Sequence, residues 1–128
     1  MKALLDTHTF LWWVTDDPLL SATAREWIGD GRNECFLSAA SAWEIAIQFA
    51  RGNLELPEPP ERYVLDRMSR CGFKPLAVKL RHALHVSVLP PHHKDPFDRL
   101  LVSQAALEGL ALISADPIIP LYGIPMIW

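Results

Sequence analysis

A chain of 128 residues, half of them apolar, has the length and composition of one compact domain with a single core, which argues against two domains. Twelve basic and fifteen acidic residues give a formal net charge of −3, so no strongly basic surface marks a nucleic-acid-binding protein. No apolar run approaches the roughly 18 uncharged residues of a membrane span, which excludes a membrane protein.

Apolar side chains in the first half of the chain recur with the spacing of short strands and amphipathic helices. In chain order we expect a strand over residues 2–5, helices over residues 9–15 and 21–31, a strand over residues 34–37 and a helix over residues 41–51. The turn Asp16-Asp17-Pro18 separates the first two helices, and Gly52 ends the third. Trp27 and Trp43 are expected on buried helix faces.

The second half of the chain continues the same alternation after a stiff proline-rich connector. We expect helices over residues 61–71, 79–88 and 96–108, and strands over residues 73–78, 110–114 and 124–128. Alternating strands and helices predict an α/β fold, a three-layer α/β/α sandwich with a central parallel sheet of four to five strands. Residues 1–128 are expected to form one domain, because no internal repeat or linker interrupts them.

Four acidic residues occupy the positions where an open parallel sheet binds ligands, beyond the carboxyl ends of its strands. Asp6 ends the first strand and Asp116 follows the strand over residues 110–114, whereas Glu44 and Asp98 lie near helix starts. Crowded carboxylates repel one another, and a divalent cation removes that cost. Oxygen ligands suit Mg²⁺ or Mn²⁺, which can orient and acidify water for attack on a phosphodiester.

Each acid near the expected site also has a simpler interpretation as a helix cap. Ser41 with Glu44 fits a capping box, and Asp95-Pro96 fits an N-cap followed by proline at the first helical position. Asp98 then lies where acids favour the helix dipole, and Asp116-Pro117 also fits a cap. Only their combination favours a metal site. Ten acidic residues remain against twelve basic ones, and the rest of the surface is mildly basic, once five acids are set aside: Asp6, Glu44, Asp95, Asp98 and Asp116.

Five segments spread over nearly the whole chain carry a recognisable series of motifs. They are LLDTH at residues 4–8, SAASAWEIAI at 38–47, HKDPFDRLL at 93–101, SAD at 114–116 and YGIPMIW at 122–128. Each is a weak signal alone, but in this order and spacing the series resembles the PIN domain family, and within it the VapC-like ribonuclease toxins of type II toxin–antitoxin systems.

The resemblance implies a Mg²⁺- or Mn²⁺-dependent endoribonuclease that hydrolyses RNA and is silenced by a small antitoxin protein. Carried over residue by residue, it implies an acidic quartet that is both catalytic and metal-binding, with two supporting hydroxyls: Asp6, Glu44, Asp98 and Asp116, with Thr7 and Ser114. Asp95 also matches a family position, although a helix cap explains it more simply. The Pro117-Ile118-Ile119 segment departs from the usual pattern and predicts a tighter rim.

Several other polar side chains have a functional and a structural interpretation. Arg99 could meet a phosphate, but pairing with Asp95 is the simpler expectation. Residues 92–94, His-His-Lys, are expected in a solvated loop rather than against RNA. His82 and His85 have the spacing of zinc ligands, but without a nearby cysteine or matching carboxylate we expect an ordinary surface helix.

The remaining tryptophans and the cysteines bear on partners and compartment. Trp12, Trp13 and Trp128 are candidates for a protein interface rather than for base stacking, and the apolar termini predict a homodimer that also binds the antitoxin. Cys35 and Cys71 lack metal-type spacing, and no secretory leader precedes them, so reduced, partly buried thiols in a cytoplasmic protein are expected.

Two further classes of function remain open at the level of sequence. The first is a catalytically inactive PIN-like module that binds protein or RNA and uses the acids only as caps. The second is a phosphotransfer or receiver domain with Asp6 as nucleophile. The segment Asp6-Thr7-His8 lacks the second aspartate of a dehalogenase-type loop, and no lysine follows a later strand as a receiver requires.

Overall fold

The computed structural model describes residues 1–128 and contains one sheet in which every strand runs parallel to its neighbours. The strands are β1 (Lys2–Leu5), β2 (Glu34–Ser38), β3 (Lys74–Leu76), β4 (Ala111–Ile113) and β5 (Met126–Ile127). Their order is β3-β2-β1-β4-β5, so β1 lies in the centre with β2 on one side and β4 on the other. The predicted α/β architecture with five parallel strands is confirmed.

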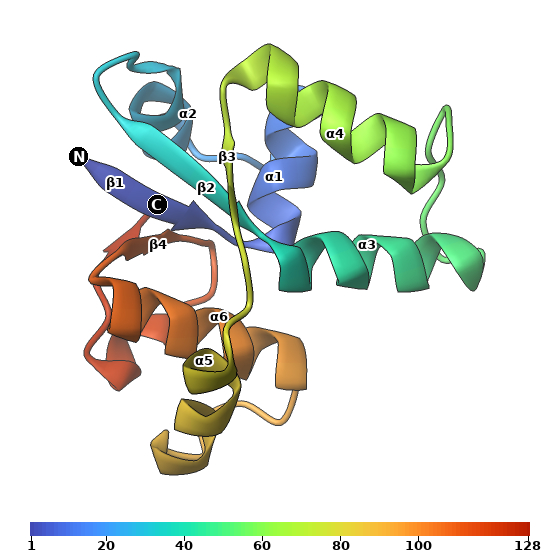
Figure 1. Ribbon diagram of the computed structural model, residues 1–128. Coiled ribbons are helices and arrows are strands. Elements are labelled where there is room, and N and C mark those ends of the chain that lie inside the picture. Colours follow the sequence, from blue (N-terminus) through green and yellow to red (C-terminus); the bar gives the residue numbers. More distant parts are fainter.

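Helices cover both faces of this sheet (Figure 1). They are α1 (Thr7–Val14), α2 (Ala22–Gly29), α3 (Ala39–Ala50), α4 (Pro60–Cys71), α5 (Leu80–His85) and α6 (Pro96–Glu108), with short 3-10 helices η1 (Val86–Val88) and η2 (Ile119–Tyr122). Helices α1, α2 and α4 lie on one side of the sheet, and α5 and α6 lie on the other (Figure 1). None of them combines the length and apolar character of a membrane span.

The two faces of β1 separate two hydrophobic cores, because successive side chains of a strand point to opposite faces. Ala3 and Leu5 belong to a core that also contains Phe10 of α1 and Ile45 of α3. Leu4 belongs to the second core, formed largely with α6, β4 and η2. Ala3, Leu4 and Leu5 are fully buried, as expected for the central strand of a sheet covered on both faces, and only Lys2 at the start of β1 is exposed.

Polar caps define where several helices begin. Asp6, Ser21, Ser38 and Asp95 each accept a hydrogen bond from a backbone N–H in the first turn of α1, α2, α3 and α6. Helix α3 therefore begins two residues before the predicted start, and the predicted capping box at Ser41 is wrong.

Burial also differs from expectation at several side chains. Trp43 is 62% exposed, because α3 turns its other faces toward the core, and its ring packs edge-on against Phe97 at 5.3 Å between centroids. Trp27 is partly buried against the first core, as expected. Cys35 is buried and Cys71 is exposed, and both are free thiols, so the expectation of partial burial is wrong for each.

Candidate active site

The strand order reverses between β1 and β4, and the candidate site lies beyond their carboxyl ends. The chain leaves β1 toward α1 and β2, whereas β4 leads to η2 and β5 on the opposite side. Two hydrogen bonds to the carbonyl oxygen of Ile113 join these ends, from the Asp6 backbone N–H at 3.1 Å and from the Thr9 hydroxyl at 2.8 Å. Such a switch point is where open parallel sheets bind ligands.

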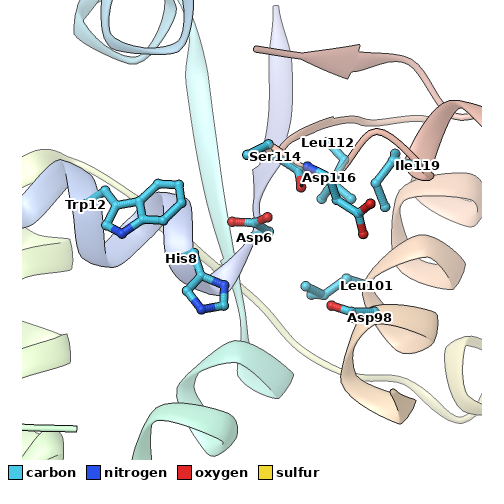
Figure 2. Close-up of a pocket in the computed structure, with 10 residues that line it drawn as sticks. Asp6, His8, Trp12, Asp98, Leu101, Leu112, Ser114, Asp116 and Ile119 are labelled. Carbon is cyan, nitrogen blue, oxygen red and sulfur yellow. Dashed lines mark hydrogen bonds between the residues drawn. The ribbon is translucent and has the colours of Figure 1, made fainter. Parts of the chain in front are cut away.

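A cleft of about 310 Å³ opens at this point. Its polar wall consists of Asp6, Asp98, Ser114 and Asp116, and His8 and Trp12 of α1 line the other side. Figure 2 shows Asp6 between the two α1 side chains and the acids Asp98 and Asp116. Three of the four predicted acids and one of the two predicted hydroxyls therefore line one cleft.

Short-range hydrogen bonds fix the orientation of two of these carboxylates. Asp6 Oδ1 accepts from the backbone N–H of Thr9 at 2.7 Å, which makes Asp6 the N-cap of α1. Asp116 Oδ1 accepts from the backbone N–H of Ile118 at 2.9 Å, and the Asp116 N–H donates to the Ser114 hydroxyl at 3.1 Å. Each carboxylate keeps an oxygen that these backbone contacts do not use.

Asp98 carries the electrostatic cost of the cluster. Burial and the negative charges of Asp95, Glu44 and Asp116 raise its pKa to about 6, and His93 partly offsets this effect. No lysine or arginine forms an ion pair with Asp6, Glu44 or Asp98. No lysine or arginine therefore neutralises this negative charge, and a bound cation would stabilise it.

Glu44 and Thr7 line a neighbouring cleft of about 540 Å³ between α1, α3 and the segment that follows α3. His8 and Trp12 line both clefts and so form the boundary between them. Glu44 is nevertheless near enough to influence Asp98 electrostatically. The Thr7 hydroxyl is buried and has no hydrogen-bond partner in the protein, so it is available to a ligand or to water.

Asp95 and Arg99 do not form the predicted ion pair. Asp95 Oδ1 accepts from the backbone N–H of Phe97 at 2.8 Å and caps α6, as its simpler interpretation predicted. The Arg99 guanidinium donates instead to the carbonyl oxygens of Val86, Leu89 and Pro90 at 3.0, 3.3 and 2.9 Å. Arg99 thus fastens the segment before α6 and contacts neither an acid nor the cleft.

His93 is the functional candidate that the sequence analysis missed. Its side chain is only 9% exposed, so the expectation of a solvated loop is wrong at this residue. Nε2 lies 2.5 Å from Asp116 Oδ2, and Nδ1 lies 2.7 Å from the Tyr122 hydroxyl. The available signal was a histidine pair directly before the acidic start of a helix.

His82 was also placed wrongly on an exposed helix face. Its side chain is fully buried, with Nδ1 accepting from the Lys79 N–H and Nε2 lying 2.9 Å from Glu108 Oε1. This contact lowers the pKa of Glu108. Both ring nitrogens are used within the protein, so His82 is structural and forms no zinc site.

The donor atoms at the cleft fit a hard divalent cation. One ligand atom each of His93, Asp98 and Asp116 lie within 4.8 Å of one another, and Asp6 faces the same cleft. A set dominated by carboxylate oxygens suits Mg²⁺ or Mn²⁺ better than zinc. The raised pKa of Asp98 is an independent sign that a positive charge would stabilise this arrangement.

Sequence comparisons connect this chain with known proteins. The model of the PIN domain family matches residues 3–123. Ribonuclease VapC16 of Mycobacterium tuberculosis is 51% identical over 72 residues, a match that covers 53% of this chain and 51% of that protein. The matched region thus spans about half the length of this relative.

Solved structures with the same fold match almost the whole chain. VapBC2 from Rickettsia felis, bound to a DNA fragment from its promoter, has a TM-score of 0.72 at 14% identity and covers 98% of this chain and 97% of its own. FitAB bound to the IR36 DNA fragment has a TM-score of 0.65 at 15% identity, and the match covers 98% of this chain and 93% of the FitAB chain. FitAcB from Neisseria gonorrhoeae has a TM-score of 0.63 at 16% identity, and the match covers 98% of this chain and 96% of the FitAcB chain. These identities support the fold alone.

Proposed function

The chain belongs to the PIN domain family, and from this premise we propose that it is a Mg²⁺- or Mn²⁺-dependent endoribonuclease that hydrolyses RNA phosphodiesters. The observation that carries the proposal is the convergence of Asp6, Asp98 and Asp116 on one cleft without a lysine or arginine partner. The name of the relative from Mycobacterium tuberculosis, a ribonuclease, supports the same activity.

The residues of the cleft would have different roles in hydrolysis. Asp6, Asp98 and Asp116 would hold the cation, with Glu44 completing the acidic quartet from the neighbouring cleft. When bound, the cation supplies a water of lowered pKa and stabilises negative charge on the phosphate. Thr7 and Ser114 would support the site, Thr7 through a free hydroxyl and Ser114 by holding the backbone of Asp116.

Cleavage of RNA by the purified protein tests the proposal. We expect activity with Mg²⁺ or Mn²⁺, loss of activity in EDTA, and a fall in kcat of about 100-fold or more for Asp6→Asn. Asparagine is also a good N-cap, so α1 should persist and the variant should fold normally. Glu26→Gln, at an exposed acid outside both clefts, is the matched control and should cleave like the wild type. Cleavage that survives both EDTA and Asp6→Asn would contradict the proposal.

The same experiment separates the proposed nuclease from a catalytically inactive binding module. If the chain is a module of that kind, the wild type and the Asp6→Asn variant should bind the partner with equal affinity. Neither should show cleavage that depends on a divalent cation. Retained binding with no cleavage under any metal condition would favour the module.

We further propose that the chain acts as one PIN-like domain in the cytoplasm and forms a homodimer. We also propose that a small antitoxin protein silences it, as the family resemblance implies. Apolar side chains support a contact between copies of the chain. Leu80 and Leu84 of α5 and Val88 of η1 are 77%, 65% and 69% exposed and follow one another at helical spacing. Exposed apolar groups on one stripe favour burial against another protein surface.

A further inference from the structure

The contacts of His93 connect the two loops that carry acids into the cleft. His93 lies in the segment before α6, whose first turn holds Asp98, and its Nε2 lies 2.5 Å from Asp116 Oδ2 beyond β4. The contact spans 23 residues of sequence. His93 therefore links the position of one predicted metal ligand to the segment that carries another.

Tyr122 holds the His93 ring from its other nitrogen. The Tyr122 hydroxyl lies 2.7 Å from Nδ1, and the two ring planes are within 7° of parallel. His92 packs edge-on against Tyr122, at 4.9 Å between ring centroids. The ring of His93 is thus confined by a hydrogen bond at each nitrogen.

The chemistry of these contacts determines which nitrogen carries the proton. An ionised carboxylate only accepts hydrogen bonds, so Nε2–H must donate to Asp116. In a neutral imidazole Nδ1 is then an acceptor, and the Tyr122 O–H donates to it. With Oδ1 of Asp116 accepting from the Ile118 N–H, both carboxylate oxygens have a fixed donor and the carboxylate plane is set.

We propose that His93 and Tyr122 are positioning residues that hold the Asp116 carboxylate in the orientation needed to bind the divalent cation. The inference rests on the proposed nuclease function and adds two residues outside the predicted quartet. Histidines and other donors that orient metal-binding carboxylates typically change metal affinity by about 10- to 100-fold when removed.

A pair of amide substitutions at position 93 tests the geometry. The glutamine amide nitrogen is as many bonds from Cβ as Nε2, whereas the asparagine amide nitrogen corresponds to Nδ1. His93→Gln should therefore keep the donor to Asp116 and bind Mg²⁺ and Mn²⁺ within about threefold of wild type, whereas His93→Asn should lose about 10-fold in affinity for both. Calorimetric titration measures the affinities, and thermal unfolding in EDTA identifies a variant that fails to fold. His92→Asn, which contacts Tyr122 but not Asp116, is the matched control and should bind like the wild type.

The tautomer of His93 gives a second readout that requires neither metal nor RNA. Nitrogen-15 spectra of the imidazole should show a protonated Nε2 and an unprotonated Nδ1 in the wild type. Tyr122→Phe keeps the ring but removes the hydroxyl, and should mix the two tautomers and weaken metal binding several-fold.

Four results distinguish the alternatives. Wild-type affinity in His93→Asn, or a wild-type ring protonated at Nδ1 and unprotonated at Nε2, would overturn the positioning role. Equal losses in His93→Gln and His93→Asn, larger for Mn²⁺ than for Mg²⁺, would overturn it in favour of direct coordination by the imidazole. A wild-type protein that binds no divalent cation contradicts the proposed function itself, while the tautomer still decides whether the hydrogen bonds exist.

Discussion

Asp98 differs from the other acids of the cleft in how its charge is stabilised. Asp6 and Asp116 each accept a hydrogen bond from a backbone N–H, whereas no donor in the protein reaches the Asp98 carboxylate. Burial and the nearby acids therefore raise the pKa of Asp98 to about 6, and His93 offsets this effect only in part. At the scale of single residues, the cost of assembling the cluster falls mainly on this side chain.

The raised pKa of Asp98 predicts how the stability of the metal-free protein depends on pH. The folded-state pKa of Asp98 lies above its unfolded value. The stability that protonated Asp98 contributes is therefore fully present below about pH 4 and is lost as pH rises through about 6. Asp98→Asn cannot ionise, so its free energy of unfolding at pH 7 should exceed that of wild type by on the order of 2 kcal/mol. Below pH 4 this difference in the free energy of unfolding should disappear, because Asp98 is then protonated in the wild type. Urea unfolding in EDTA across this range measures the difference.

The same substitution should weaken the stabilisation by metal. A cation that binds only the folded state raises the melting temperature, and loss of one ligand reduces that increment. Asp98→Asn should therefore melt higher than wild type in EDTA but gain less from Mg²⁺. If Asp98→Asn instead melts lower in EDTA and responds fully to Mg²⁺, Asp98 is a structural residue and not a ligand.

Among the secondary-structure elements, α6 has the most direct effect on the site, because its first turn carries Asp98 and its N-cap is Asp95. Asp95 stabilises the helix through the hydrogen bond to the Phe97 N–H and at the same time raises the pKa of Asp98 by its charge. These two effects have opposite signs for the stability of the metal-free protein.

Substitutions of Asp95 separate the cap from the charge. Asp95→Ser keeps a capping oxygen and removes the charge, whereas Asp95→Ala removes both. We expect Asp95→Ala to be less stable than Asp95→Ser by roughly 1 kcal/mol at neutral pH, with the rise in melting temperature on adding Mg²⁺ preserved in both variants. Loss of the magnesium response in Asp95→Ser would instead identify Asp95 as a metal ligand.

The elements also show how far sequence reasoning extends. Helix α6 and strand β1 have the predicted bounds, because Asp95-Pro96 and Gly109 mark the helix ends and Asp6 ends an apolar strand. The start of α3 was misplaced because Ser38 and Ser41 are both plausible caps, and only the end of β2 decides between them. The convergence of Asp6 and Asp116 followed from strand ends, a property of topology, whereas Asp98 was predicted from its place at the start of a helix.

Contacts that depend on side-chain packing could not be predicted from the sequence. Nothing in the spacing of His82 and His93 reveals that each ring lies against an acid distant in the chain, Glu108 and Asp116. Arg99 has acids as sequence neighbours, yet the three carbonyl oxygens it reaches belong to the segment folded beside α6.

For the whole molecule, the distribution of exposed apolar side chains shifts the expected contact surface. Trp12, Trp13 and Trp128 pack partly buried against the chain's own first core, with 5.8 Å between the ring centroids of Trp12 and Trp128. Leu80, Leu84 and Val88 remain far more exposed. The stripe along α5 and η1 is therefore the better candidate for a contact between copies.

A single charge on that stripe tests the homodimer. Sedimentation at tens of micromolar should give a dimer for the wild type and a monomer for Leu84→Lys, because a buried unpaired charge opposes association. Arg62→Lys in α4 changes a residue outside the stripe without changing charge and should remain dimeric. A monomeric wild type would contradict the dimer, and a dimeric Leu84→Lys would direct attention to another surface.

The position of β1 in the sheet bears on the order of events during synthesis. Of the five strands of the sheet, β1 is synthesised first although it lies in the centre, and its register with β4 pairs Ala3 with Ala111. This pairing forms late, because β4 must first be synthesised and because closing the long loop between the two strands costs chain entropy. Asp6 is translated well before Asp116, and the two can meet only after residue 116 has been added. If these acids form the proposed nuclease site, the topology keeps a growing chain inactive until residue 116 has been added.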